Sequence, residues 1–446
     1  MSFLDSTVSK TGLVICAMLV AGTSSVLRAQ QTTPLPDPLT LDYALSLADD
    51  PHPELLLQDA RIQSALAEHE RAENNAGFDV YLDLGVQEMD NDRTSIQRQD
   101  HARAGLVVSK TLYDFGRTSK LSDSARQLVE SEQLTFLDTR ARRRLEILQA
   151  YFDVLLADLN FNHQNEAMAI AFIAADRLRD RRELGQASDL QVVEEEANYE
   201  RVRGLRYRSE NQQRETRARL AAAINRPDNL PANLVIPKLD VLSRKLPEIE
   251  ELQNLALTNN YVLQSRRKRV TAAEESLSAA RANYRPVLRG LLEAYEYDTD
   301  TGSSDEVRAE IALQVPLYQA GQSANVSREL ARLYAERAQL EKAEVALRQA
   351  VLDLWHRIEE LRIKRDESAK LLEFRELHLE RSRALYEMEV RADLGDAMVK
   401  LTEAQYLSAR NDYQLALAWH QMDILTGQLQ LEPVQQSFNN QKISQE

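Results

Sequence analysis

Two kinds of hydrophobic pattern alternate along the chain, one with a period near 3.6 residues and one with a period of two. Apolar residues three and four positions apart, such as Leu145, Leu148, Phe152 and Leu155, predict amphipathic helices. Helices of about 35 to 65 residues would run roughly 50–100 Å, which suits a bundle or coiled coil rather than a globule. The pattern fills four proline-free stretches rich in helix-forming residues, at 117–184, 188–225, 322–388 and 396–426.

The period of two predicts strands between these helices. Apolar and polar residues alternate in GFDVYLDLGVQ (77–87) and again in EVRAEIALQV (306–315). Partner strands fit at 101–111 and, less regularly, at 286–297, each joined to its neighbour by a polar loop. The sequence therefore predicts two strand pairs, 78–111 and 286–316, whose strands have one apolar and one polar face.

The same order of elements occurs twice. Each half is predicted as a helix, a strand, a polar loop, a strand, a long helix, a turn and a helix. The first repeat spans 39–225 and the second 251–428, with a proline-rich linker or equatorial region at 226–250 between them. The Gln- and Asn-containing tail at 429–446 is predicted to be disordered.

Both repeats carry the sequence Leu-Tyr-x-x-Gly at the corner where a strand pair ends and a long helix begins. The residues concerned are Tyr113 and Gly116 in the first repeat, and Tyr318 and Gly321 in the second. Glycine supplies the backbone freedom that a sharp corner needs. A tyrosine at such a corner is typical of a membrane interface.

The N-terminus has the pattern of a secretory signal peptide, assigned to residues 1–29. Lys10 precedes the apolar run GLVICAMLVAG (12–22), which is too short to span a bilayer, and cleavage is expected near Ala29. The alternative is an apolar N-terminal helix. The only cysteine, Cys16, lies within this run, and Ile15 before it disfavours lipidation. A cleaved chain would therefore have no disulfide.

Composition and motifs exclude several classes of function. Acidic residues outnumber basic ones by 70 to 55, and the net charge of −15 argues against a partner nucleic acid. The seven histidines show no metal-ligand spacing, and no phosphate loop or nucleophile motif occurs. We therefore expect no catalytic residue, no cofactor and no metal site, and the protein is not predicted to be an enzyme.

The strands have the length of tilted membrane strands, about ten residues each. The alternative is a soluble four-stranded sheet covered by helices, but the predicted helices are too long for so small a sheet. Four strands cannot close a barrel, and their edges would stay unpaired in lipid. Three copies would supply twelve strands and could close a transmembrane β-barrel, and the family resemblance described next implies a homotrimer that shares one.

Residues 39–428 resemble the TolC-like outer-membrane efflux protein family, also called outer membrane factors. The resemblance implies a mainly α fold, in which a long helical coiled-coil barrel forms a periplasmic tunnel below a twelve-stranded barrel in the outer membrane of a Gram-negative bacterium. It rests on the order of the two repeats and on four motifs: LTLDYALSLA (39–48), LYDFGR (112–117), LGQASDLQVVEEEA (184–197) and VPLYQAGQ (315–322).

The resemblance also implies a function and partners. The expected protein is a passive exit duct of a tripartite efflux pump or a type I secretion system. A periplasmic adaptor (membrane fusion) protein would couple it to an inner-membrane pump or ABC transporter. The cargo is not predicted. The alternative is a periplasmic adaptor or coiled-coil scaffold without a barrel, but adaptors carry one helical hairpin and this chain has two.

In the family, the helix-to-helix turns form the gate and meet the adaptor. The second turn, MEVRADLGDA (388–397), departs from the family because Glu389 or Val390 replaces a glycine, and Gln191 stands where the first turn often has an acid. The candidate adaptor contacts are Leu184, Gly185, Ala187, Ser188, Val390 and Ala392. The candidate gate residues are Asp189, Gln191, Arg391, Asp393 and Asp396.

Asp396 is open to two interpretations. Three copies of its carboxylate around a narrow pore would attract cations and, with Asp393 and Arg391, form inter-chain bonds that hold the tip shut. The alternative is a solvated acid at a helix start, favoured by the helix dipole.

Overall fold

The computed structural model describes residues 35–89, 99–229, 231–298, 306–388 and 393–428 of the 446-residue chain. The described residues from Pro36 onward form one unit by their contacts. The predicted signal peptide, the predicted disordered tail and four residues of the second turn (Glu389, Val390, Arg391 and Ala392) lie outside the described residues.

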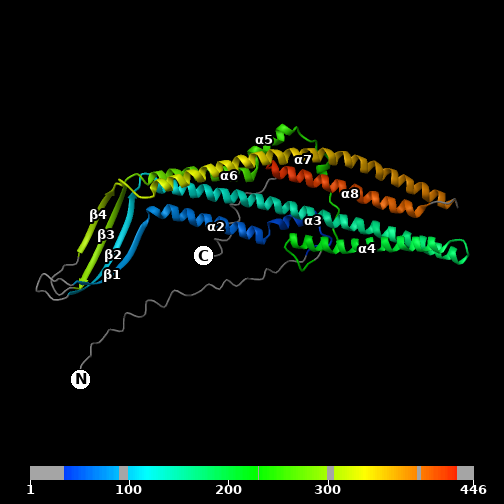
Figure 1. The fold of residues 1–446 in the computed structure, drawn as a ribbon, viewed down its shortest axis with the longest axis horizontal. Coiled ribbons are helices and arrows are strands. Elements are labelled where there is room, and N and C mark those ends of the chain that lie inside the picture. Colours follow the sequence, from blue (N-terminus) through cyan, green and yellow to red (C-terminus); the bar gives the residue numbers. More distant parts are fainter. Residues whose placement is uncertain (1–34, 90–98, 230, 299–305, 389–392, 429–446) are drawn as a thin grey trace, which may run out of the picture. The chain divides into compact units, whose positions relative to one another are not determined.

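Helices and strands form where the two hydrophobic periods predict them (Figure 1). The described part of the chain also contains three short 3-10 helices, η1 (Leu47–Asp49), η2 (Asn74–Ala76) and η3 (Asp240–Ser243). The first half contains α1 (Leu41–Ser46), α2 (Pro53–Glu73), β1 (Phe78–Met89), β2 (Gln99–Tyr113), α3 (Arg117–Glu183) and α4 (Asp189–Ala223). The second half contains α5 (Ile249–Asn259), α6 (Tyr261–Ala282), β3 (Val287–Asp298), β4 (Glu306–Gln314), α7 (Gln322–Glu387) and α8 (Leu394–Leu425).

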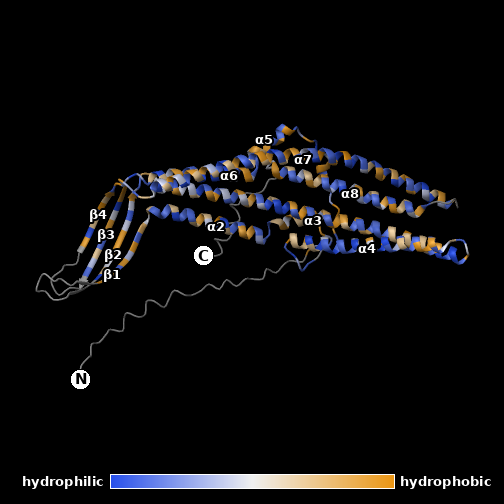
Figure 2. Ribbon diagram, in the orientation of Figure 1, coloured by the Kyte–Doolittle hydropathy of each residue, from blue (hydrophilic) through white to orange (hydrophobic). Residues whose placement is uncertain are grey.

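The long helix α3 is the centre of the helical packing. Helices α2, α4, α6 and α8 all pack against it, while α5, α6 and α8 pack against α7. Polar and apolar residues alternate along the long helices in Figure 2, as expected when only one stripe of each helix is buried. A core of Leu252, Ile358, Leu415 and Trp419, each fully buried, joins α5, α7 and α8.

The segment between the repeats packs on one face of α7 and α8. The Arg244 guanidinium lies 4.7 Å from the centre of the Trp419 ring and pairs with Asp423 at 2.6 Å. Trp355 donates its indole N–H to the carbonyl oxygen of Pro247 at 3.0 Å.

The four strands form one antiparallel sheet in the order β1-β2-β3-β4. The pairing of β2 with β3 joins the two repeats. Leu106 of β2 lies opposite Leu82 of β1 on one side and opposite Ala294 of β3 on the other. Strands β1 and β4 are the edges of this open sheet, so one copy of the chain forms no closed barrel.

Candidate functional site

One face of the sheet is apolar across all four strands. Leu82 and Ile311, on the two edge strands, are 65% and 72% exposed. Among the described helices, the short η2 is the only one that packs appreciably against the sheet. The apolar residues of this apolar sheet face are Phe78, Val80, Leu82, Leu84, Val86, Ala104, Leu106, Val108, Leu288, Gly290, Leu292, Ala294, Val307, Ala309, Ile311 and Leu313, and the register places Lys110 and Glu296 on the same face toward its ends.

The other face of the sheet is polar and carries a cross-strand network. Asp83 of β1 accepts hydrogen bonds from Arg103 of β2 at 3.3 Å and from the Tyr295 hydroxyl of β3 at 3.1 Å. The Tyr295 ring covers Gly105, where a Cβ atom would lie 2.2 Å from the ring. These side chains hold β1, β2 and β3 in register. Because they are charged or hydrogen-bonding groups, this face suits a polar or aqueous environment.

Both Leu-Tyr-x-x-Gly corners turn on a left-handed glycine. Gly116 has φ of 90° and Gly321 has φ of 83°, and each directly precedes a long helix. This is the backbone region that glycine enters at little cost, as the sequence predicts. In the first corner the Asp114 carboxylate also accepts hydrogen bonds from the backbone N–H groups of Gly116 and Thr118, at 3.2 and 2.8 Å.

The corners are tied to the end of α6. Arg285, three residues after α6, donates to the carbonyl oxygen of Phe115 at 2.7 Å, and the buried Gln322 amide donates to the carbonyl oxygen of Ala280 at 2.8 Å. The side chains of Tyr113 and Tyr318 are 57% and 87% exposed. Their role at a membrane interface stays a prediction.

The first helix-to-helix turn is closed by local hydrogen bonds. Gly185, with φ of 75°, follows α3, and Ser188 caps α4. The Ser188 side chain accepts from the Gln191 backbone N–H at 3.3 Å, while the Gln191 side chain accepts from the Ser188 backbone N–H at 3.0 Å. Gln191 therefore holds the helix start in a capping box. Leu184 and Asp189 beside it are exposed, and Ala187 completes the turn.

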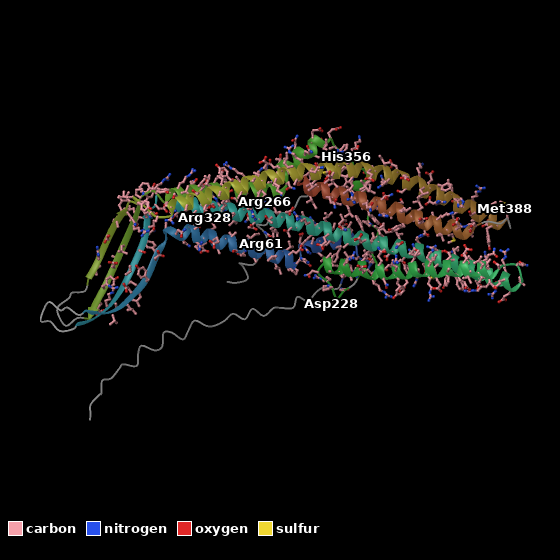
Figure 3. All side chains as sticks on the ribbon, in the orientation of Figure 1. Arg61, Asp228, Arg266, Arg328, His356 and Met388 are labelled. Atoms are coloured by element: carbon pink, nitrogen blue, oxygen red, sulfur yellow. The ribbon has the colours of Figure 1, made fainter. Side chains whose placement is uncertain are left out.

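The second turn brings Asp393 and Asp396 together with a residue that sequence reasoning missed. Asp393 caps α8 by accepting a hydrogen bond from the Asp396 backbone N–H at 3.3 Å. The Asp396 carboxylate forms an ion pair with Lys400, one helical turn further on. The spacing of four residues could have indicated this pair from the sequence. Figure 3 places Met388, the last described residue before this turn, at the end of α7 away from the sheet.

Neither a helical membrane span nor a metal cluster is found in the described parts of the chain. None of the helices there combines the length and the apolar run that crossing a membrane would need. No group of three or more His, Cys, Asp and Glu side chains within the described ranges is placed to hold a metal ion.

Comparisons with known proteins agree with this architecture. Residues 44–226 match the outer membrane efflux protein family. A search of curated proteins found none that matches the chain. The family match, which covers residues 44–226, confirms the resemblance to the TolC-like outer-membrane efflux proteins.

Solved structures of outer-membrane channels share the fold over most of the chain. The outer membrane protein VceC of Vibrio cholerae is 16% identical with a TM-score of 0.71, over 87% of this chain and 96% of that one. The CmeC outer membrane channel of Campylobacter jejuni is 14% identical with a TM-score of 0.73, over 91% and 89%. The MtrE outer membrane channel of Neisseria gonorrhoeae is 18% identical with a TM-score of 0.69, over 87% and 88%.

Proposed function

We propose that the protein is an outer-membrane exit duct of a tripartite efflux pump or a type I secretion system. It passively conducts substrate from an inner-membrane transporter through the periplasm to the outside. The observation that carries the proposal is the sheet, with one uncovered apolar face and one polar face, joined to the long helices of an efflux-protein fold. A periplasmic adaptor or scaffold would leave that apolar face in water.

Closure of the sheet follows from the direction of its edge strands. Each neighbouring pair is antiparallel, so β1 and β4 of one chain run in opposite directions. Strand β4 of one copy beside β1 of the next therefore continues the antiparallel pattern. Three copies give a twelve-stranded barrel whose apolar faces all meet lipid and whose polar faces line the lumen. No backbone edge is then left unpaired in the membrane.

The helices of the three copies continue the lumen as a periplasmic tunnel. Their turns are the proposed contacts with a periplasmic adaptor protein, which links the duct to its pump or ABC transporter. At the first turn, the exposed side chains of Leu184, Leu190 and Val193 offer an apolar surface for such a contact, since they are 60–77% exposed. The energy for transport comes from the inner-membrane partner, and no catalytic step is assigned to this chain.

The gate hypothesis places Asp393, Asp396 and Arg391 at the closed end of the tunnel, where bonds between copies hold it shut. The Lys400 ammonium group already neutralises Asp396 within one chain, so Lys400 belongs to the same charge network. Neutralising Asp396 and Arg391 together, as Asp396→Asn and Arg391→Gln, is expected to raise single-channel conductance. A folded trimer with unchanged conductance would contradict the gate and leave the duct itself standing.

Conductance in planar lipid bilayers tests the duct, and two neighbouring residues of β1 give a matched pair of variants. Leu82→Lys puts a charge on the apolar sheet face, where lysine in lipid costs about 2–4 kcal/mol near the midplane. Tyr81→Lys puts the same charge on the polar face. We expect discrete channels from the wild type and from Tyr81→Lys, and greatly reduced insertion of Leu82→Lys. Equal insertion of both variants would contradict the proposed orientation.

A further inference from the structure

A wide groove lies along the helical part of the chain. It has a volume of about 770 Å³ and is bounded by α3, α4 and α8, with Arg357 of α7 at its side. Its floor includes Leu156 and Leu417, and amide side chains line it as well, namely Gln149, Asn211, Gln212, Gln414 and Gln421. All of its walls come from one copy of the chain.

The groove opens on the side away from the segment between the repeats. On α8, that segment covers Trp419 and Asp423, whereas Arg410, Gln414 and Gln421 line the groove. At about 100° per residue, these two sets lie on opposite faces of the helix. We take this second face as the one that lines the tunnel of the proposed duct.

The charge of the groove is opposite to that of the chain. Four guanidinium groups line it, those of Arg208, Arg219, Arg357 and Arg410, against two carboxylates, Asp153 and Glu215. The whole chain, by contrast, has a net charge of −15. Burial raises the pKa of the Asp153 carboxyl, while the charge of Arg219 acts to lower it. Because the pKa is raised, Asp153 ionises less readily, and the negative charge in the groove is reduced.

Most of this positive charge has no paired carboxylate among the residues that the structure describes. Arg219 pairs with Glu215, one helical turn away. Arg208, Arg357 and Arg410 form no hydrogen bond or ion pair with another described residue. The charge of Arg357 is a minor cause of the lowered pKa of Glu360. Glu360 itself is paired with Lys364. Three guanidinium groups from three helices are therefore free to donate into one groove.

We propose that this groove is a binding site for the anionic groups of the cargo, carboxylate or phosphate, during transit. Arginine suits this task because its planar fork donates two parallel hydrogen bonds to such groups. The apolar floor and the surrounding amides would hold the uncharged part of an organic anion. The proposal rests on the proposed function for its place in the tunnel, where three copies would form a cationic belt.

Binding of inorganic tripolyphosphate to the purified protein in detergent, followed by calorimetry, tests the groove apart from the duct. The test variant replaces Arg208, Arg357 and Arg410 with glutamine. A matched control is Arg348→Gln, because Arg348 is exposed and lies nine residues before Arg357, on the opposite face of the same helix. We expect the triple variant to bind at least roughly tenfold more weakly than the wild type, and the control to bind as the wild type does.

Equal tripolyphosphate affinity of the triple variant and the wild type, or a loss as large in Arg348→Gln, would overturn the groove as an anion site. Because one chain forms the groove, this result does not depend on whether channels form in bilayers. Where channels do form, the concentration of tripolyphosphate that halves their conductance should rise by a similar factor in the triple variant. Absent conductance with intact binding would instead count against the duct.

Discussion

Gly395 of α8 lies so close to Ile170 of α3 that a Cβ atom added to the glycine would be 2.6 Å from Ile170 Cδ1. Ala397, about 200° round the helix from Gly395, is 1% exposed, so the first turn of α8 is buried on this side as well. This contact fixes the start of α8, where Asp393 and Asp396 lie, against the longest helix of the chain. The absence of a side chain at Gly395 therefore sets the position of the second turn.

Gly395→Ala is expected to loosen this turn. The added methyl group forces Ile170 aside, and overpacking of this kind costs about 1–3 kcal/mol. Thermal unfolding followed by circular dichroism should show a lower midpoint. In an Ile170→Ala background the same Gly395→Ala change should cost much less, because the smaller side chain leaves room for the methyl group.

A second glycine in a helix supplies the control for Gly395. Gly204, in α4, has no neighbouring atom within 4 Å of an added Cβ. Gly204→Ala should leave the midpoint unchanged or raise stability by about 0.5–1 kcal/mol, since alanine is the better helix former. An equal loss in both variants would show that the contact with Ile170 is not the cause.

Acid is expected to loosen the start of α2 through His52. The His52 ring nitrogen Nδ1 caps this helix by accepting from the Glu54 backbone N–H at 3.3 Å, which requires an unprotonated Nδ1. Burial lowers the pKa of His52, and the charge of Arg143 lowers it further, against an opposing effect of Glu54. Because the folded pKa is depressed, this stability is present above the ordinary value of 6.5 and is lost as the pH falls through the folded pKa.

Hydrogen–deuterium exchange of the first turn of α2, corrected for the intrinsic rate, measures this effect. Between pH 8 and pH 5 the wild type should lose protection, and His52→Asn, which keeps a cap without a titrating ring, should not. Arg143→Met should move the loss to higher pH, because it removes a positive charge that disfavours protonation of His52. Identical pH dependence in the wild type and His52→Asn would rule out the histidine.

Strong alkali is expected to destabilise the helices through two buried tyrosines. Burial is the main cause that raises the pKa of Tyr151 and of Tyr413, each to about 12. With folded pKa values above the ordinary 10.0, the stability is complete below pH 10 and falls toward pH 12, by up to about 1.4 kcal/mol per pH unit for each group. The unfolding midpoint should drop across this range.

The two tyrosines differ at neutral pH, which makes them controls for each other. The Tyr151 hydroxyl lies 2.6 Å from the carbonyl oxygen of Val235 and 2.9 Å from that of Leu39, so Tyr151→Phe should lose about 1 kcal/mol at pH 8. Tyr413 stacks on Phe152 at 4.5 Å and makes no hydrogen bond to a described residue, so Tyr413→Phe should be nearly neutral. Either change should weaken the alkaline loss. An unaltered alkaline profile in both would contradict this assignment.

The local elements could be predicted from the sequence because each depends on neighbouring residues. The alternation in 78–86 predicts β1, the proline-free stretches predict α3 and α7, and the two corner glycines predict positive φ. These features follow from side-chain period and backbone sterics, which act over a few residues.

The contacts between distant segments could not be predicted in the same way. The pairing of β2 with β3, the approach of Gly395 to Ile170 and the convergence of Arg208, Arg357 and Arg410 all depend on how separate helices and strands pack. No local pattern records such packing. Gln191 is a different case, because the spacing of Ser188 and Gln191 is itself the local pattern of a capping box, and a role of Gln191 at the gate stays a prediction.

Disulfide cross-linking of the sheet edges tests the central claim most directly. The only cysteine is Cys16, so introduced pairs report without interference from the rest of the chain. Within one chain, β1 and β4 are three strand spacings apart, about 14 Å, whereas a disulfide needs Cα atoms within about 7 Å. A bond between these strands therefore has to join two copies.

Leu82→Cys should be paired in turn with Val307→Cys, Ala309→Cys and Ile311→Cys, all on the apolar sheet face, to allow for a shift of register between copies. After oxidation in membranes, we predict that at least one pair gives a covalent trimer on a non-reducing gel, while each single-cysteine variant gives at most a dimer. Monomers from every pair, in protein that is folded and membrane-inserted, would contradict a barrel shared by three copies.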